Sequence, residues 1–218
     1  RCLVRAPAPL PRKPKSVSPG FTAKDLSRKV FDGRWRVGVD RVVDPIGKTL
    51  WRLGVRADHV TLFGVAAAAA TAAMVAIDRF GLAFSFIVLT GLGDLLDGPV
   101  AKAAGTVSTR GAFLDSVSDR VSDALILGAL TYYLLDDGVL ALLPVAVLAS
   151  GQFVSYLRAK AESLGLDARG GLAERAERFV VLCFGLLVPG WLPHVLWALL
   201  GLTLVTVVQR FTKIWRQF

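Results

Sequence analysis

The sequence predicts an all-α integral membrane protein with six transmembrane helices and an N-terminal interfacial amphipathic segment. Two observations support this fold class. The 218 residues are 54% hydrophobic and have a mean hydropathy of +0.54, so the chain is richer in apolar residues than an ordinary soluble domain. The apolar residues also gather into segments near the length of about 20 residues that a helix needs to cross a bilayer. We expect one membrane domain, residues 57–218.

The charge pattern favours membrane lipid over nucleic acid as a partner. The formal net charge is +9, but the basic residues lie between apolar runs and in the N-terminal region. That distribution is typical of headgroup contact and membrane orientation, and we expect no nucleic-acid partner. The two cysteines, Cys2 and Cys183, form neither a disulfide framework nor a metal quartet.

The N-terminal region divides into two parts before the first apolar segment. Residues 1–30 are expected to be a disordered basic tail, because five prolines stand among basic residues in the first 20 positions without the apolar core of a signal peptide. Residues 31–56 mix Trp and Val with Arg and Lys, and Pro45 would interrupt or kink a helix there. We expect this part to be an amphipathic segment at the membrane interface; a solvated linker is the alternative.

Six apolar segments follow, at residues 60–77, 81–104, 111–135, 139–156, 172–188 and 192–208. The second, third and fifth reach spanning length only if their polar ends are counted, so those ends should face protein. Three connections on one side of the membrane hold a single basic residue, Arg79, and the other side receives most of the rest. By the positive-inside rule, both termini are expected to face the cytoplasm, with the protein in the plasma membrane.

Four aspartates interrupt the second and third segments. An ionised acid at mid-depth costs about 2.5–3.5 kcal/mol, so such residues indicate function. Asp94 and Asp97 are three apart and Asp115 and Asp119 are four apart, which places each pair on one helix face. Residues 105–110 are few enough to make the two helices antiparallel neighbours, with both pairs facing one pocket.

Carboxylates alone suit hard cations such as Mg²⁺ or Mn²⁺, whereas Zn²⁺ normally recruits His or Cys. The chain has only His59 and His194, neither close to the acids in sequence. Two ions about 3.5–4 Å apart form the usual clamp for displacement at phosphorus. Gly98 and Gly111 would let a phosphate or a base approach the helix backbone closely; helix packing is their alternative role.

The acids and glycines together resemble the signature of a known family. The chain reads Asp94-x2-Asp97-Gly98-x2-Ala101-Lys102-x8-Gly111-x3-Asp115-x3-Asp119. The CDP-alcohol phosphotransferase family reads D-x2-D-G-x2-A-R-x8-G-x3-D-x3-D, so the chain departs from it only at Lys102. Lysine keeps the positive charge but loses the bidentate phosphate geometry of arginine.

The resemblance implies transfer of a phosphatidyl group from CDP-diacylglycerol to an alcohol, with release of CMP. It implies that Asp94, Asp97, Asp115 and Asp119 ligate two Mg²⁺ or Mn²⁺ ions, and that Asp119 is also the general base. The implied nucleotide site comprises Thr61, Asp94, Gly98, Ala101, Lys102 and Gly111. Thr61 could instead serve as a helix-start hydroxyl. A homodimer is the assembly that the family suggests.

Basic residues at the ends of the fourth and fifth segments indicate the acceptor. Arg158 and Lys160 face Arg175 and Arg178, and such a set makes a cradle for a phosphate dianion. This part resembles the phosphatidylinositol phosphate synthase branch of the family, which implies inositol 1-phosphate as the acceptor. Glycerol 3-phosphate, as in a phosphatidylglycerol phosphate synthase, is the alternative. The charges could also mark only the cytoplasmic side, with nearby glutamates as partners.

Asp123 continues the face of Asp115 and Asp119 by one turn, and we expect it to pair with a cation such as Arg120 rather than to bind metal. A divalent-cation transporter is the alternative from another functional class, because intramembrane carboxylates alone would suit it. Against a transporter, the acids gather toward one side of the membrane, and no inverted repeat is visible.

Overall fold

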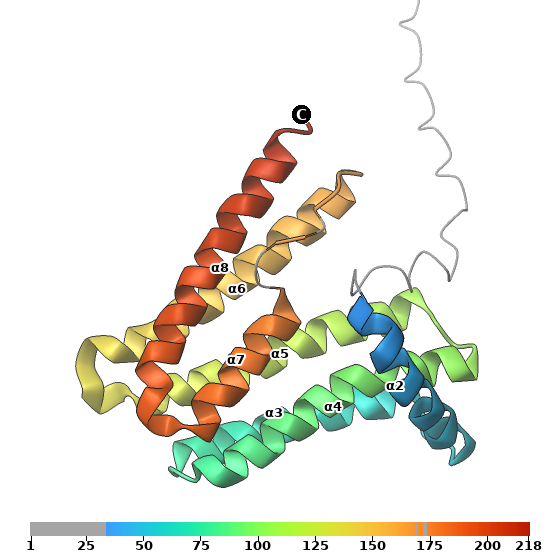
Figure 1. The fold of residues 1–218 in the computed structure, drawn as a ribbon, viewed down its shortest axis with the longest axis horizontal. Coiled ribbons are helices and arrows are strands. Elements are labelled where there is room, and N and C mark those ends of the chain that lie inside the picture. Colours follow the sequence, from blue (N-terminus) through green and yellow to red (C-terminus); the bar gives the residue numbers. More distant parts are fainter. Residues whose placement is uncertain (1–33, 169, 172–173) are drawn as a thin grey trace, which may run out of the picture. The chain divides into compact units, whose positions relative to one another are not determined.

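The computed structural model describes residues 34–168, 170–171 and 174–218, with side chains from residue 43 onward. The predicted disordered tail, residues 1–30, lies outside this part of the chain. The described elements are all helical (Figure 1). They are α2 Arg34–Arg52, α3 Ala57–Ala76, α4 Phe80–Ala104, α5 Thr109–Tyr133, η1 Leu135–Ala141, α6 Leu142–Ser163, α7 Arg175–Leu187, η2 Pro189–Trp191 and α8 Leu192–Trp215. From Val39 to Phe218 they form one compact unit.

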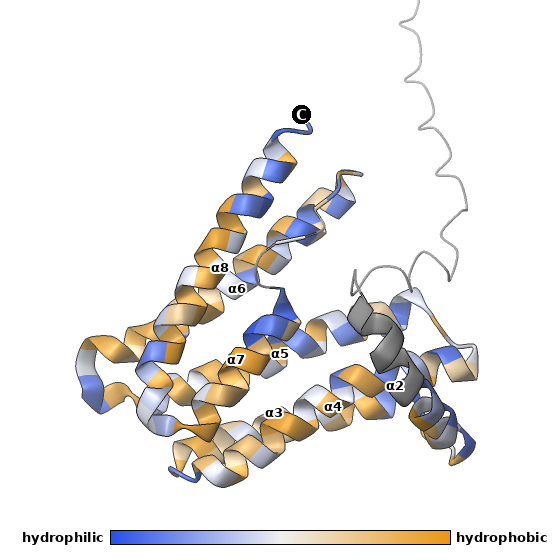
Figure 2. Ribbon diagram, viewed as in Figure 1, coloured by the Kyte–Doolittle hydropathy of each residue, from blue (hydrophilic) through white to orange (hydrophobic). Residues whose placement is uncertain are grey.

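Four segments are long and apolar enough to cross a membrane: α3, α4, Leu135–Ser163 and Pro189–Trp215. Figure 2 shows apolar residues along the middle of α3, α4 and α8, and polar residues toward the ends of α6 and α8. The all-α membrane class is therefore confirmed for the described residues. The six-span count stays a prediction, because α5 carries several charged residues and α7 has 13 residues. Thirteen helical residues rise only about 20 Å, against a bilayer core of about 30 Å.

The predicted interfacial segment contains helix α2. The helix runs through Pro45 without ending there, so this proline does not break it. Gly47 of α2 packs against α4, where an added Cβ atom would lie 2.7 Å from the Cβ of Pro99. Only glycine fits this approach. The amphipathic placement of α2 at a membrane interface stays a prediction.

The turn between α4 and α5 is built by two residues suited to it. Gly105 ends α4 in the left-handed conformation, with φ of 65°, and its N–H donates to the carbonyls of Ala101 and Lys102. Ser108 caps α5, because its Oγ accepts a hydrogen bond from the N–H of Gly111 at 3.1 Å. The first turn of α5 is thereby fixed next to the last turn of α4.

Helix α3 is the common neighbour of α4 and α5. Helices α4 and α5 are antiparallel as predicted, but each packs mainly on α3, and the two meet through side chains such as Phe80 and Tyr133. Glycines allow the α3–α4 approach: an added Cβ atom at Gly93 would lie 3.1 Å from the Cα of Gly64. On the other side, α6 packs on α5 and α8, and α7 packs on α4 and α8.

The apolar core occupies one half of this helix bundle. Its buried members come from the second halves of α3, α5 and α7 and the first halves of α4, α6 and α8. They include Val75, Ile87, Leu130, Leu196 and Leu199. The predicted site residues lie on the other halves of the same helices. The fold thus separates a packed apolar end from a polar end.

Candidate functional site

The two pairs of aspartates converge although their helices pack mainly on α3. Asp94 and Asp97 lie on the second half of α4, and Asp115 and Asp119 on the first half of α5. Arg175 connects the pairs, since its Nη1 forms an ion pair with Asp94 and lies 2.9 Å from Oδ1 of Asp119. The carboxyl groups of Asp97 and Asp115 are within interaction distance of each other. All four acids therefore surround one site.

Thr61 on α3 supports this cluster from the side. The side chain is 7% exposed, and its Oγ1 lies 3.1 Å from Oδ2 of Asp97 and 3.1 Å from the carbonyl oxygen of Ala57. The single hydroxyl proton is donated to one of them at a time. Arg56 is the N-cap of α3, so the helix-start role for Thr61 is wrong. The hydroxyl orients a carboxylate instead.

The chemistry of these donors fits a hard divalent cation. Carboxylate oxygens with an orienting hydroxyl behind them are suited to Mg²⁺ or Mn²⁺. With the side chains as they stand, no three His, Cys, Asp or Glu of the described residues are arranged to hold an ion. The guanidinium of Arg175 lies among the carboxylates and offsets part of their charge.

The glycines of the signature leave open helix surface beside the acids. Within the described part of the chain, no atom of a neighbouring residue comes within 4 Å of a Cβ added at Gly98. At Gly111 the one neighbour is the Ser108 hydroxyl, at 3.4 Å. Helix packing therefore does not account for Gly98. Ala101 lies half-buried on the same helix, three residues further along α4.

Lys102 turns toward α2 in this structure. Its Nζ lies 3.0 Å from Oδ2 and 3.4 Å from Oδ1 of Asp44, and the lysine side chain is largely exposed. Sequence reasoning missed Asp44 as a partner. The available signal was an acidic residue within a predominantly basic segment. Together with the Gly47–Pro99 contact, this ion pair places α2 directly over the end of α4.

Arg175 and Arg178 open α7 next to the acids. Arg178 borders a cavity between α5, α6, α7 and α8, together with Asp123 and Gly151. Nε and Nη2 of Arg175 and Nη1 of Arg178 are buried and make no hydrogen bond to any described residue. Buried guanidinium nitrogens that make no hydrogen bond are costly. They are suited to receive the oxygens of an anionic ligand.

Asp123 does not have the partner that the sequence suggested. Its Oδ1 lies 3.7 Å from Nε of Arg175, whereas the guanidinium of Arg120 donates to the carbonyl oxygen of Ser116. Arg175 therefore interacts with three carboxylates, those of Asp94, Asp119 and Asp123. The expectation that Asp123 pairs with a cation is met by Arg175 instead of Arg120.

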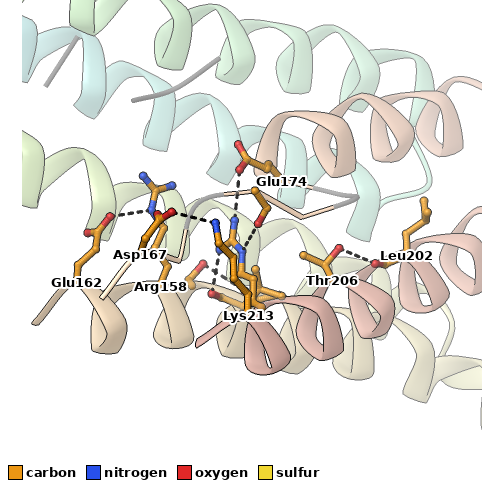
Figure 3. A network of polar contacts seen from close by, with 12 residues as sticks. Arg158, Glu162, Asp167, Glu174, Leu202, Thr206 and Lys213 are labelled. Atoms are coloured by element: carbon orange, nitrogen blue, oxygen red, sulfur yellow. Dashed lines mark hydrogen bonds and ion pairs between the residues drawn. The ribbon is translucent and has the colours of Figure 1, made fainter. Parts of the chain in front are cut away.

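The other two predicted acceptor residues lie at the end of α6. Nε of Arg158 lies 3.2 Å from Oε1 of Glu162, one turn further along the same helix (Figure 3). Lys160 is exposed. The Arg158–Glu162 pair is what we expect if these charges only mark the cytoplasmic side, with nearby glutamates as partners. Arg175 and Arg178 lie closer to the acids than Arg158 and Lys160 do.

Sequence reasoning also missed Arg210 on α8, which is 4% exposed. Its guanidinium donates to the carbonyls of Gly170, at 3.1 Å, and Val154, at 3.2 Å, and pairs with Glu174 at 3.4 Å. Arg158 and Arg178 lie within electrostatic range of it. In the sequence, Arg210 looks like the start of a basic tail. The signal was its position two residues after an apolar run, where the helix could continue to bury it.

Comparison with known proteins identifies the family of the chain. Residues 55–209 match the family described as CDP-alcohol phosphatidyltransferase. The phosphatidylinositol phosphate synthase of Streptomyces avermitilis is 40% identical over 196 residues, which are 81% of this chain and 79% of that protein. The archaetidylinositol phosphate synthase of Methanothermobacter thermautotrophicus is 34% identical over 199 residues, 88% of this chain and 98% of that protein.

Solved structures show the same fold. The crystal structure of Mycobacterium tuberculosis phosphatidylinositol phosphate synthase with CDP-DAG bound is similar to this chain with a TM-score of 0.74 and 30% identity, covering 80% of this chain and 94% of that one. The same enzyme in complex with manganese and citrate also gives a TM-score of 0.74 at 30% identity, covering 79% and 88%. The chain therefore belongs to the CDP-alcohol phosphatidyltransferase family, and within it resembles the phosphatidylinositol phosphate synthases.

Proposed function

We propose that this protein is a membrane transferase that moves the phosphatidyl group of CDP-diacylglycerol to inositol 1-phosphate and releases CMP. The observation that carries this proposal is the carboxylate cluster adjoining buried guanidinium nitrogens of Arg175 and Arg178 that make no hydrogen bond to any described residue. Acids and cations side by side are what a reaction between a pyrophosphate and a phosphorylated alcohol requires. The names of the relatives and the related structure with CDP-DAG bound support both substrates.

Asp94, Asp97, Asp115 and Asp119 are the proposed ligands of two Mg²⁺ or Mn²⁺ ions. Bound there, the ions supply Lewis-acid neutralisation of the pyrophosphate and of the charge on the leaving nucleotide. The related structure with manganese supports divalent metal use in this family. Thr61 holds Asp97 in the orientation that ligation requires.

Asp119 is the proposed general base. Its carboxylate accepts the proton of the acceptor hydroxyl, whose oxygen then attacks the phosphorus that carries the diacylglycerol. The bond from this phosphorus to the departing CMP breaks as the new bond forms. Arg175 contacts Asp119 at 2.9 Å, so a phosphate bound by Arg175 would place its alcohol close to the base.

The nucleotide and acceptor are proposed to approach from different helices. Asp94, Gly98, Ala101, Lys102 and Gly111 line the nucleotide side, where α4 and the first turn of α5 expose backbone, and Thr61 acts there through Asp97. The acceptor phosphate is bound by the basic residues of α6 and α7. These are Arg158, Lys160, Arg175 and Arg178.

We also propose the finer organisation of the protein. The catalytic domain is residues 57–218, with six spans, preceded by an interfacial segment at 31–56 and a disordered tail at 1–30. The site and both termini face the cytoplasm of the plasma membrane, which the single arginine at the opposite end, Arg79, supports. The protein forms a homodimer, as the family resemblance implies. Among the small residues of α3, Gly64, Ala67 and Ala68 are buried within the chain, whereas Ala66, Ala69 and Ala73 are exposed.

The proposal is tested by CMP release from CDP-diacylglycerol in detergent, with inositol 1-phosphate, glycerol 3-phosphate or free inositol as acceptor. We expect release only with divalent metal, and fastest with inositol 1-phosphate.

Asp119→Asn should lower kcat by at least about 100-fold, and Arg178→Ala should raise the KM for the acceptor. Arg79→Ala removes the same charge at the other end of the bundle and should change neither. Equal rates with glycerol 3-phosphate would contradict the acceptor, and no release with any acceptor would contradict the reaction.

A further inference from the structure

One face at the end of α8 contacts the connection between α6 and α7 through several polar groups. Thr206, Arg210, Lys213 and Gln217 are spaced four, three and four residues apart, so they lie on one side of α8 and the turn that follows it. We call these four residues the clamp face. The described residues of the connection that touch it are Asp167, Gly170, Gly171 and Glu174 (Figure 3).

The clamp face engages Asp167 through every polar group that this residue has. The backbone N–H of Asp167 donates to Oε1 of Gln217 at 2.8 Å, and Nε2 of Gln217 donates to the Asp167 carbonyl oxygen at 2.7 Å. One side-chain amide thus pairs with both backbone groups of one residue, as a neighbouring β-strand would. Nζ of Lys213 lies 3.0 Å from Oδ2 of the Asp167 carboxylate.

The remaining clamp residues hold the connection closer to α7. Arg210 donates to the Gly170 carbonyl and pairs with Glu174, the residue directly before α7. Gly171 has φ of 147°, and an added Cβ there would lie 2.7 Å from Cγ2 of Thr206. Glycine is required at this approach because any side chain would collide with α8. The connection is therefore seated on α8 at both of its ends.

The contacts of the connection bear on ligand binding because the two helices that it joins carry the basic residues. It runs from the end of α6, which carries Arg158 and Lys160, to the start of α7, which begins at Arg175. Arg175 reaches Asp94 and Asp119 from the first residue of its helix. A shift of the connection would therefore move the basic residues of α6 and α7 relative to each other and to the acids.

We propose that Lys213 and Gln217 are positioning residues for the phosphorylated acceptor. By fixing Asp167 they set the spacing between the basic groups of α6 and α7, and so set acceptor affinity without touching the ligand. This inference rests on the proposed acceptor role of Arg158, Lys160, Arg175 and Arg178. It assigns a function to the last turn of α8 and to the turn that follows it, which lie after the apolar part of the helix.

The first test measures binding of inositol 1-phosphate to the full-length protein with Mn²⁺ by titration calorimetry, together with steady-state kinetics. Gln217→Ala should weaken acceptor binding and raise its KM by about 3- to 10-fold, the range that one or two hydrogen bonds correspond to. kcat and the KM for CDP-diacylglycerol should change by less than about twofold. Arg216→Ala, which removes a charge from the same turn, should leave all four values unchanged.

A charge exchange gives a readout that general destabilisation would not move. Asp167→Lys and Lys213→Asp should each raise the acceptor KM, and the double variant should restore it toward the wild-type value. Amide hydrogen exchange at Asp167 should become faster in Gln217→Ala, because its N–H loses its acceptor. Faster exchange with unchanged acceptor affinity would overturn the positioning role.

The outcomes also separate this inference from the proposed reaction. If the wild type binds inositol 1-phosphate but releases no CMP, the reaction is wrong, and weaker binding by Gln217→Ala still supports the positioning role. Equal binding by wild type and Gln217→Ala overturns the positioning role alone. A wild type that does not bind inositol 1-phosphate overturns both.

Discussion

Thr61 shows how a single hydroxyl on one helix can organise a charged site on another. Helix α3 has no acid in the cluster, yet its Thr61 reaches Asp97 of α4 at 3.1 Å. A group that orients a metal ligand typically contributes a factor of about 10–100 in metal affinity or activity. The same helix carries Thr71, whose hydroxyl donates to the Ala67 carbonyl within the apolar half.

We therefore predict that Thr61→Val raises the Mn²⁺ concentration for half-maximal activity by about 10-fold or more. The cause is loss of the hydroxyl that orients Asp97, at nearly constant side-chain volume. Thr61→Ser keeps the hydroxyl and should remain near the wild-type value. The measurement is CMP release as a function of Mn²⁺ at saturating substrates.

Thr71→Val is the matched control, since it removes a buried threonine hydroxyl from the same helix away from the acids. It should leave the Mn²⁺ dependence unchanged. If Thr61→Val and Thr71→Val behave alike, Thr61 has only a packing role.

Single residues also show which contacts can be predicted from the sequence and which cannot. The spacing of Asp94, Asp97, Asp115 and Asp119 predicts their shared site because helix periodicity fixes which residues lie on one face. The partner of Asp123 and the partner of Lys102 depend on how separate helices meet. No local pattern carries that information, and so the pairing of Asp123 with Arg175 and of Lys102 with Asp44 was found only in the structure.

At the scale of helices, apolar runs predict that a helix exists better than they predict where it ends or which helices it packs against. The segment 81–104 agrees closely with α4, whereas α6 and α8 continue beyond their apolar runs, to Ser163 and Trp215. They continue because their polar residues find partners, as Arg158 does with Glu162. The short link makes α4 and α5 antiparallel neighbours, but glycines let α3 pack more closely against α4 than α5 does.

This packing leads to a prediction on stability. Gly93→Ala should lower the melting temperature in detergent by about 2–10 °C relative to Gly64→Ala, because overpacking costs about 1–3 kcal/mol. A Cβ at Gly93 meets the Gly64 backbone at 3.1 Å, whereas a Cβ at Gly64 has its nearest neighbour at 3.7 Å, an ordinary contact. Both changes gain the same helix propensity, so their difference reports packing. Equal melting temperatures would contradict the close approach of α3 and α4.

At the scale of the whole membrane domain, the site itself bears on how often the chain crosses the bilayer. Arg175, at the start of α7, contacts acids on both α4 and α5, so the start of α7 lies at the same depth as the acid cluster. The far end of α5 returns to the start of α4, where the rings of Tyr133 and Phe80 are 4.8 Å apart. Helix α5 therefore runs the length of α4 in the opposite direction. This supports six spans although the composition of α5 and the length of α7 are atypical.

Single-cysteine labelling distinguishes six spans from four. In a Cys2→Ser, Cys183→Ala background, we predict that an impermeant maleimide added to intact spheroplasts labels Val139→Cys but not Leu164→Cys or Phe218→Cys. All three positions are well exposed, at 79%, 52% and 81%, so access is decided by the membrane. Permeabilised cells should label all three and provide the control. If only the four most apolar segments cross the membrane, Val139→Cys is cytoplasmic and Leu164→Cys is external. The basic residues of α6 and the acids of α4 would then lie on opposite sides of the membrane. That pattern would contradict both the six-span topology and a site shared by the two helices.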